Sequence, residues 1–126
     1  MKDGKKVILC IDDDQDVLDS LRIILEGNNY VMFEAPSAEK GIQKYKETSP
    51  DAIIVDMMME EVDSGIHLSK ELKFIDNKAP IFMLSSAGDN LNENIDYNEL
   101  GLSGVLQKPF NPEHILKLLK SKLHGS

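Results

Sequence analysis

Reactive polar side chains follow four apolar runs of this sequence, each close to the point where the run stops. An unbroken apolar run is typical of a strand that is buried on both faces of a parallel sheet. The runs and the groups behind them are 7–11 with Asp12, Asp13 and Asp14, 52–55 with Asp56, 81–84 with Ser85 and Ser86, and 105–106 with Lys108. The carboxyl ends of parallel strands share one edge of a sheet, which is where ligands of open α/β sheets bind. The sequence therefore predicts one site that combines acids, a hydroxyl and an ammonium group.

The acids at these strand ends predict a site for a hard divalent cation. Two unit charges about 4 Å apart repel by roughly 4 kcal/mol at an effective dielectric constant of about 20. Asp12, Asp13 and Asp56 would repel one another in this way unless a cation lay between them. A few carboxylates that offer only oxygen ligands suit Mg²⁺. The alternative is that residues 12–16 only cap the helix that follows, and the matching positions of Asp56 and Lys108 favour the metal site.

Asp56 beside a cation, a hydroxyl and an ammonium has the partners that phosphoryl transfer needs. Its carboxylate can act as the nucleophile, and the product would be an acyl phosphate. Lys108 can balance charge on the phosphoryl oxygens, and Ser85 can donate a hydrogen bond to one of them. Taken singly, Lys108 fits a surface lysine and Ser85 fits a strand cap, so the hypothesis depends on the whole set of positions.

Other kinds of site find little support in the residues. An EF-hand calcium loop beginning at Asp12 would need Gly and Glu where Val17 and Ile23 stand, so that loop is excluded. No glycine-rich phosphate loop follows the first apolar run, which argues against a dinucleotide or Walker-type site. The histidines have no ligand spacing with each other or with the cysteine; they are His67, His114 and His124.

The elements that must position these groups alternate between strand and helix. Strands are predicted at 7–11, 30–35, 52–56, 81–84 and 105–106. Helices are predicted from a cap at Asp14 or Asp16 to Gly27, from Pro36-Ser37 to about 47, at 66–74, at 91–100, and from Asn111-Pro112 to about 123. This alternation predicts an α/β fold in which right-handed crossovers place helices on both faces of a parallel sheet.

Length, net charge and cysteine content narrow the possible domain organisation, partners and compartment. The 126 residues fit a single domain, 1–126, with a core of about 5–123. The net charge of −8 argues against direct binding to nucleic acid or to an anionic membrane, and favours a cation or a basic partner. Cys10 has no disulfide partner, and the N-terminal apolar run is too short for a signal peptide or a membrane span. We therefore expect a cytoplasmic protein with Cys10 in its core.

Four motifs together resemble the receiver domain of two-component response regulators, from about residue 5 to 123. They are Ile8-Leu9-Cys10-Ile11-Asp12-Asp13-Asp14, Ile53-Ile54-Val55-Asp56, Pro80-Ile81-Phe82-Met83-Leu84-Ser85 and Leu106-Gln107-Lys108-Pro109-Phe110. Each motif is weak alone, but their order and spacing are specific. The resemblance implies a flavodoxin-like, doubly wound sheet of strand order 2-1-3-4-5 with five helices.

The same resemblance implies roles for individual residues. Asp56 would accept a phosphoryl group from a histidine kinase or a histidine phosphotransfer protein. Mg²⁺ would be ligated by Asp13, Asp56 and the backbone carbonyl of Met58, with Asp12 acting mostly through water. Ser85 and Lys108 would contact the phosphoryl group. Such a domain signals through a downstream protein or a fused output domain that responds to its phosphorylation, and it is not a turnover enzyme.

Several positions depart from the pattern of that family. Glu60 stands where Pro is usual, and Gly65 lies one residue late. Counting back from Lys108 favours Ser86 as the hydroxyl, whereas four apolar residues after Pro80 favour Ser85, which we select. Val105 occupies the position of a usual aromatic switch residue.

Two rival functions follow from the same residues. An aspartate-nucleophile phosphohydrolase would generally place a second acid two residues after the nucleophile, where this chain has Met58. A phosphate-independent adaptor would use the fold for protein contacts alone, and the complete set of acids, serine and lysine argues against it.

Overall fold

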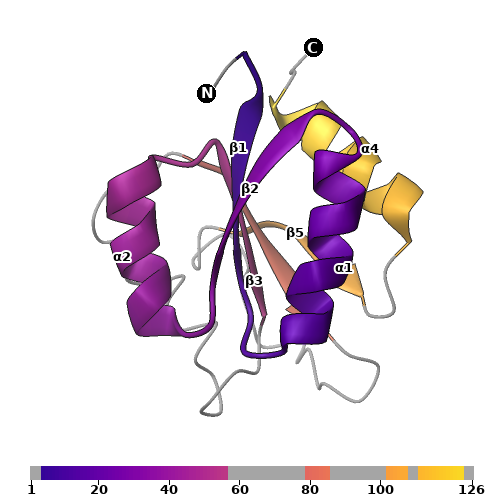
Figure 1. The fold of residues 1–126 in the computed structure, drawn as a ribbon. Coiled ribbons are helices and arrows are strands. Elements are labelled where there is room, and N and C mark those ends of the chain that lie inside the picture. The colour runs from indigo at the N-terminus through magenta and orange to yellow at the C-terminus, as the bar shows by residue number, and fades with distance from the viewer. Residues whose placement is uncertain (1–3, 57–78, 86–101, 108–110, 124–126) are drawn as a thin grey trace.

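The computed structural model of this chain describes residues 4–56, 79–85, 102–107 and 111–123. Five strands and three helices lie in these ranges (Figure 1). In chain order they are β1 (Lys6–Ile11), α1 (Gln15–Glu26), β2 (Tyr30–Ala35), α2 (Ala38–Thr48), β3 (Ala52–Asp56), β4 (Ile81–Ser85), β5 (Leu102–Gln107) and α4 (Pro112–Leu123). The helices predicted at 66–74 and 91–100 fall outside the described residues.

The strands form one parallel sheet in the predicted order, β2-β1-β3-β4-β5. The chain leaves β1 towards β2 on one side, and then crosses back to add β3 on the other side. This reversal makes the carboxyl ends of β1 and β3 the two sides of a topological switch point. The fold therefore provides the kind of position at which open α/β sheets bind ligands.

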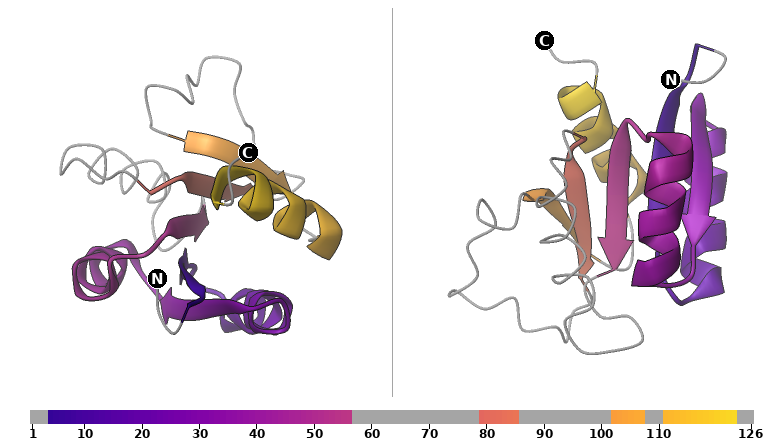
Figure 2. Two further views of the ribbon diagram at one scale, coloured as in Figure 1. Left: turned by 90° about the horizontal axis from the view of Figure 1, so that it is seen from above. Right: turned by 90° about the vertical axis from the view of Figure 1, so that its left-hand side faces the viewer.

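Helices cover both faces of the sheet, with α1 and α4 on one face and α2 on the other (Figure 2). Alternate residues of β1 serve the two layers, because Ile8 and Cys10 pack with α1 and α4 whereas Leu9 and Ile11 pack on the α2 side. Every residue of β3 is buried. Burial on both faces explains why these strands read as unbroken apolar runs. Cys10 is fully buried, as predicted, and desolvation by that burial raises the pKa of its thiol.

Short polar side chains start each described helix. Asp14 accepts a hydrogen bond from the Asp16 amide at 2.9 Å, so Asp14 rather than Asp16 caps α1. Ser37 caps α2, and Asn111 accepts from the amides of Glu113 and His114 at the start of α4. These contacts satisfy amides that a helix leaves unpaired at its first turn. None of the described helices is long and apolar enough to cross a membrane.

Strand β5 begins earlier than the sequence predicted. Leu102 already pairs with Ile81 of β4, although two glycines and a serine suggested a loop up to residue 104. The pairing shifts register between Ile81 and Phe82, and Gly104 lies beside the Phe82 ring, where an added Cβ would stand 3.2 Å from Cδ1. The missing side chain thus leaves room for the Phe82 ring beside β5, which local propensity does not reveal.

Candidate metal and phosphoryl site

The ends of β1 and β3 bring three aspartates together. Ile11 pairs with Val55, so Asp12 and Asp56 follow at the same level on neighbouring strands. One carboxylate oxygen from each of Asp12, Asp13 and Asp56 lies within 4.8 Å of the other two. We call these three residues the acidic cluster. The structure confirms the predicted convergence of the three side chains at one edge of the sheet.

Backbone hydrogen bonds hold the loop that carries two members of the cluster. The Asp12 amide donates to the Ala35 carbonyl at 3.1 Å, which ties the loop to the end of β2. The Asp14 amide donates to Asp12 Oδ1 at 2.9 Å. Because Asp14 also caps α1, the Asp12 carboxylate is fixed relative to both the sheet and the helix. The N-terminus of α1, which is the positive end of the helix dipole, follows directly after this loop.

Burial makes the acidic cluster energetically unusual. Asp12 is fully buried and Asp56 is 4% exposed, whereas Asp13 is open to solvent. Among the described residues, Asp12 and Asp56 are the buried charged side chains. Two charges at the outer limit of this 4.8 Å spacing repel by about 3 kcal/mol at an effective dielectric constant of about 20. Such a concentration of buried charge at a switch point is typical of a functional site.

The donor set of the cluster fits Mg²⁺. Its atoms are carboxylate oxygens, the hard ligands that this ion prefers, and few of them are needed because Mg²⁺ keeps several waters. The exposed Asp13 leaves one side of the cluster open to water. Asp12 offers a carboxylate to this site while its Oδ1 accepts the Asp14 amide.

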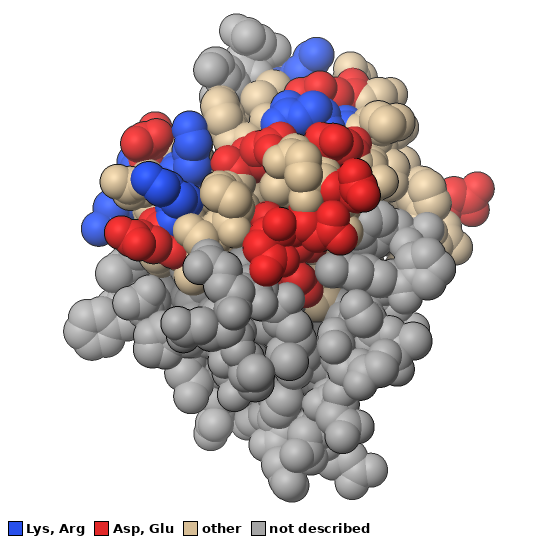
Figure 3. Space-filling view, turned by 60° about the horizontal axis from the view of Figure 1, so that its bottom comes forward, with Lys and Arg blue, Asp and Glu red and all other residues tan. Residues whose placement is uncertain are grey.

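Charge around this edge of the sheet reinforces the preference for cations. Exposed acids follow the cluster into the first turns of α1; they are Asp14, Asp16 and Asp19. Figure 3 shows acidic side chains gathered on this face, while the neighbouring surface mixes both signs. A concentrated negative field of this kind raises the local concentration of cations.

Of the other predicted site residues, one lies in the described part of the chain. Ser85 is the last residue of β4, at the level just beyond the pair formed by Asp56 and Leu84, so its backbone lies at the same edge of the sheet. Met58, Ser86 and Lys108 lie outside the described residues.

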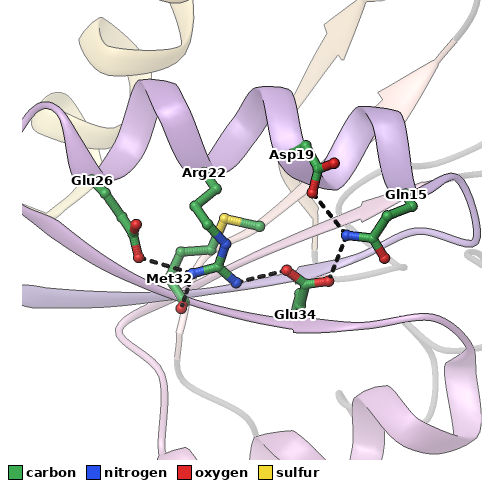
Figure 4. A network of polar contacts seen from close by, with 6 residues as sticks. All are labelled: Gln15, Asp19, Arg22, Glu26, Met32 and Glu34. Carbon is green, nitrogen blue, oxygen red and sulfur yellow. Dashed lines mark hydrogen bonds and ion pairs between the residues drawn. The ribbon is translucent and has the colours of Figure 1, made fainter.

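A polar network beside the cluster was missed by the sequence analysis (Figure 4). Glu34 of β2 accepts from Arg22 on Oε1 at 2.6 Å and from Gln15 on Oε2 at 2.9 Å. The hydrogen bond from Arg22, followed by that from Gln15, lowers the pKa of the Glu34 carboxyl. The same bond to Glu34 raises the pKa of the Arg22 guanidinium. A charged residue within the β-forming segment 30–35 was the available signal.

Comparison with known proteins places this geometry in a family. Residues 8–120 match the sequence profile of the response regulator receiver domain. The chemotaxis protein CheY of Bacillus subtilis (strain 168) is 35% identical over 118 residues, which are 93% of this chain and 97% of that protein. The alkaline phosphatase synthesis transcriptional regulatory protein PhoP of the same strain is 30% identical over 96% of this chain. The matched segment is 50% of PhoP, so this chain spans about half of that relative.

Solved structures agree with the sequence relatives. The crystal structure of a CheY-like response regulator receiver domain protein from Methanospirillum hungatei JF-1 superposes with a TM-score of 0.86 at 26% identity, over 96% of this chain and 95% of the other. A response regulator receiver domain protein from Clostridium thermocellum gives a TM-score of 0.84 at 26% identity, with 94% of each chain covered. With its sheet order, its acidic strand ends and these matches in agreement, the chain belongs to the receiver domain family of two-component response regulators.

Proposed function

We propose that Asp56 accepts a phosphoryl group from a histidine kinase or a histidine phosphotransfer protein, in a reaction that depends on Mg²⁺ at the acidic cluster. The observation that carries this proposal is the convergence of Asp12, Asp13 and Asp56 within 4.8 Å at the switch point of the sheet. Membership of the receiver family supports phosphoryl transfer to an aspartate as the reaction. Asp12 and Asp13 are assigned to the cation, and Asp56 to both the cation and the phosphoryl group.

The transfer is a displacement at phosphorus. A carboxylate oxygen of Asp56 forms a bond to phosphorus as the bond from phosphorus to the donor imidazole nitrogen breaks, and the imidazole keeps that electron pair. Bound Mg²⁺ supplies positive charge that offsets the negative charge of the phosphoryl oxygens. We assign the same task to the Lys108 ammonium. The Ser85 hydroxyl is assigned a hydrogen bond to a phosphoryl oxygen. The Met58 backbone carbonyl is assigned as one further ligand of Mg²⁺.

The acyl phosphate then biases binding to a downstream protein or a fused output domain. We assign residues 1–126 to one receiver domain with a core of about 5–123, acting as a signalling domain and not as a turnover enzyme. The net charge of −8 favours protein partners over direct contact with nucleic acid or an anionic membrane. The free thiol of Cys10 fits the cytoplasm, where we place the protein.

The first experiment is intact mass spectrometry after incubation with Mg²⁺ and a small phosphodonor such as phosphoramidate. The native chain is expected to gain one phosphoryl adduct that base removes and that EDTA prevents. Asp56→Asn should gain none, while Glu39→Gln, which removes an exposed acid on α2, should behave like the native chain.

Other outcomes would change the assignment. An adduct that persists in Asp56→Asn would move the phosphoacceptor to another residue. A native chain that gains no adduct from any donor would contradict the proposal and favour a phosphate-independent adaptor. Turnover of a generic phosphomonoester would favour a phosphohydrolase.

A further inference from the structure

Glu34 connects the helix that follows the acidic cluster to the strand beside it. Its Oε2 accepts from the side chain of Gln15, the first residue of α1, and its Oε1 accepts from Arg22, two turns further along (Figure 4). One carboxylate of β2 therefore holds α1 at two levels. We call Glu34, Gln15 and Arg22 the Glu34 clamp.

The Glu34 clamp reaches the acidic cluster from both sides of the Asp12 to Asp14 loop. On the strand side, Ala35 directly follows Glu34, and the Ala35 carbonyl accepts the Asp12 amide at 3.1 Å. On the helix side, Gln15 directly follows Asp14, whose amide donates to Asp12 Oδ1 at 2.9 Å. The two ends of this short loop are thus joined through a single carboxylate.

The clamp does more for geometry than for overall stability. The Arg22 and Glu34 side chains are 35% and 29% exposed, and partly exposed ion pairs add little to the free energy of folding. A loop that must present carboxylates to a small cation is sensitive to displacements that hardly alter stability, because Mg²⁺ demands a near-ideal arrangement of its ligands. Arg22 also balances the charge of Glu34, so Glu34 adds little net attraction for a cation.

We propose that Glu34 is a positioning residue that sets the affinity of the acidic cluster for Mg²⁺. It acts through Gln15 and Ala35, which hold the loop carrying Asp12 and Asp13. This inference rests on the cation site of the proposed function. Groups that orient metal ligands from outside the coordination shell commonly change metal affinity by an order of magnitude when they are replaced.

The test is the dissociation constant for Mg²⁺, measured by isothermal titration calorimetry on the full chain without a phosphodonor. Glu34→Gln should weaken binding roughly fivefold to tenfold, because one amide oxygen cannot replace the two acceptors of the carboxylate. Gln15→Ala breaks the clamp without changing charge and should weaken binding by about threefold or more. Glu26→Gln removes the same charge and another Arg22 partner, but this pair lies within α1, and its effect should stay below about twofold.

Each result decides between positioning and its alternatives. Weaker binding in Glu34→Gln with unchanged binding in Gln15→Ala would mean that only charge matters, and would overturn the inference. So would unchanged binding in both variants while the native chain binds Mg²⁺. A native chain that binds no Mg²⁺ would overturn the cation site as well. Urea unfolding of every variant establishes that the titrated protein is folded, and Gln15→Ala carries the test if Glu34→Gln does not fold.

Discussion

We expect the charge on Asp56 to lower the stability of the folded chain when no cation is bound, because Asp12 and Asp13 lie beside it. Asp56 is 4% exposed and shares the 4.8 Å cluster with Asp12 and Asp13. Asp56→Asn keeps the shape of the side chain and removes one of these charges. We expect the free energy of unfolding in EDTA to rise by about 1–2 kcal/mol, because a repulsion of about 3 kcal/mol is only partly relaxed in the native cluster. Urea denaturation measures this change.

The control for that prediction is Glu39→Gln, which removes a charge on the exposed surface of α2. Its unfolding free energy should stay within about 0.5 kcal/mol of the native value. If Asp56→Asn were less stable than the native chain in EDTA, Asp56 would have to gain more from its own contacts than it loses by repulsion.

The Glu34 ion pair predicts how stability responds to acid. Hydrogen bonds from Arg22 and Gln15 lower the pKa of Glu34 below its ordinary value of 4.5. A carboxyl with a lowered folded-state pKa stabilises the fold above its unfolded pKa, and this contribution disappears as the pH falls through the folded value. We expect the free energy of unfolding of the native chain to exceed that of Glu34→Gln by at most about 1 kcal/mol near neutral pH, since the pair is partly exposed.

That difference should shrink towards zero as the pH is lowered below 4.5. Urea denaturation of both proteins along a pH series measures it. A difference that stays constant or grows in acid would show that the carboxylate charge of Glu34 does not stabilise the fold.

Helix α2 approaches β1 closely at Gly41. A Cβ at this position would lie 2.5 Å from Ile11 Cδ1 and 3.0 Å from Cγ1, so Ile11 would have to move. Gly41→Ala gains about 1 kcal/mol of helix propensity, but overpacking costs roughly 1–3 kcal/mol. We expect a net loss of about 1 kcal/mol in unfolding free energy, measured by thermal or urea denaturation.

Gln43→Ala is the matched control, since Gln43 is exposed on the same helix. Its stability should be unchanged or slightly higher. If Gly41→Ala matched Gln43→Ala, the Ile11 side chain would have to rotate away at little cost, and the close approach of α2 would not depend on glycine.

Most of the elements could be predicted from local pattern, and the exceptions have physical causes. The described helices begin at predicted cap residues because the side chains that bond free amides, such as Ser37 and Asn111, are recognisable in sequence. The buried strands were visible as apolar runs. The start of β5 was not, because Gly104 disfavours a strand locally, whereas its pairing with Phe82 joins segments that are distant in sequence.

At the scale of the whole molecule, topology made the acidic cluster predictable. Asp12 and Asp56 are 44 residues apart in sequence, yet parallel strands bring their ends to one edge. The Glu34 clamp could not be predicted in this way. Its contacts depend on how α1 packs against β2, and the periodicity of the sequence does not show which polar side chains of the two elements meet. Positions at strand ends follow from the fold class, whereas contacts between side chains on different elements depend on how those elements pack in three dimensions.

Net charge makes the whole molecule sensitive to ions, and a specific cation site must be separated from this general effect. The chain carries a formal charge of −8, so any salt reduces the self-repulsion of the compact state. A cation that binds only the folded chain adds stability as its concentration rises, by about 2.7 kcal/mol at one hundred times its dissociation constant.

We expect MgCl₂ to raise the unfolding free energy well above the value in NaCl at equal ionic strength. Asp13→Asn should remove this excess and leave the NaCl response intact, because Asp13 is the exposed member of the acidic cluster and its loss changes little else. Equal stabilisation by the two salts in calorimetry would mean that the carboxylates at the ends of β1 and β3 respond to ionic strength alone.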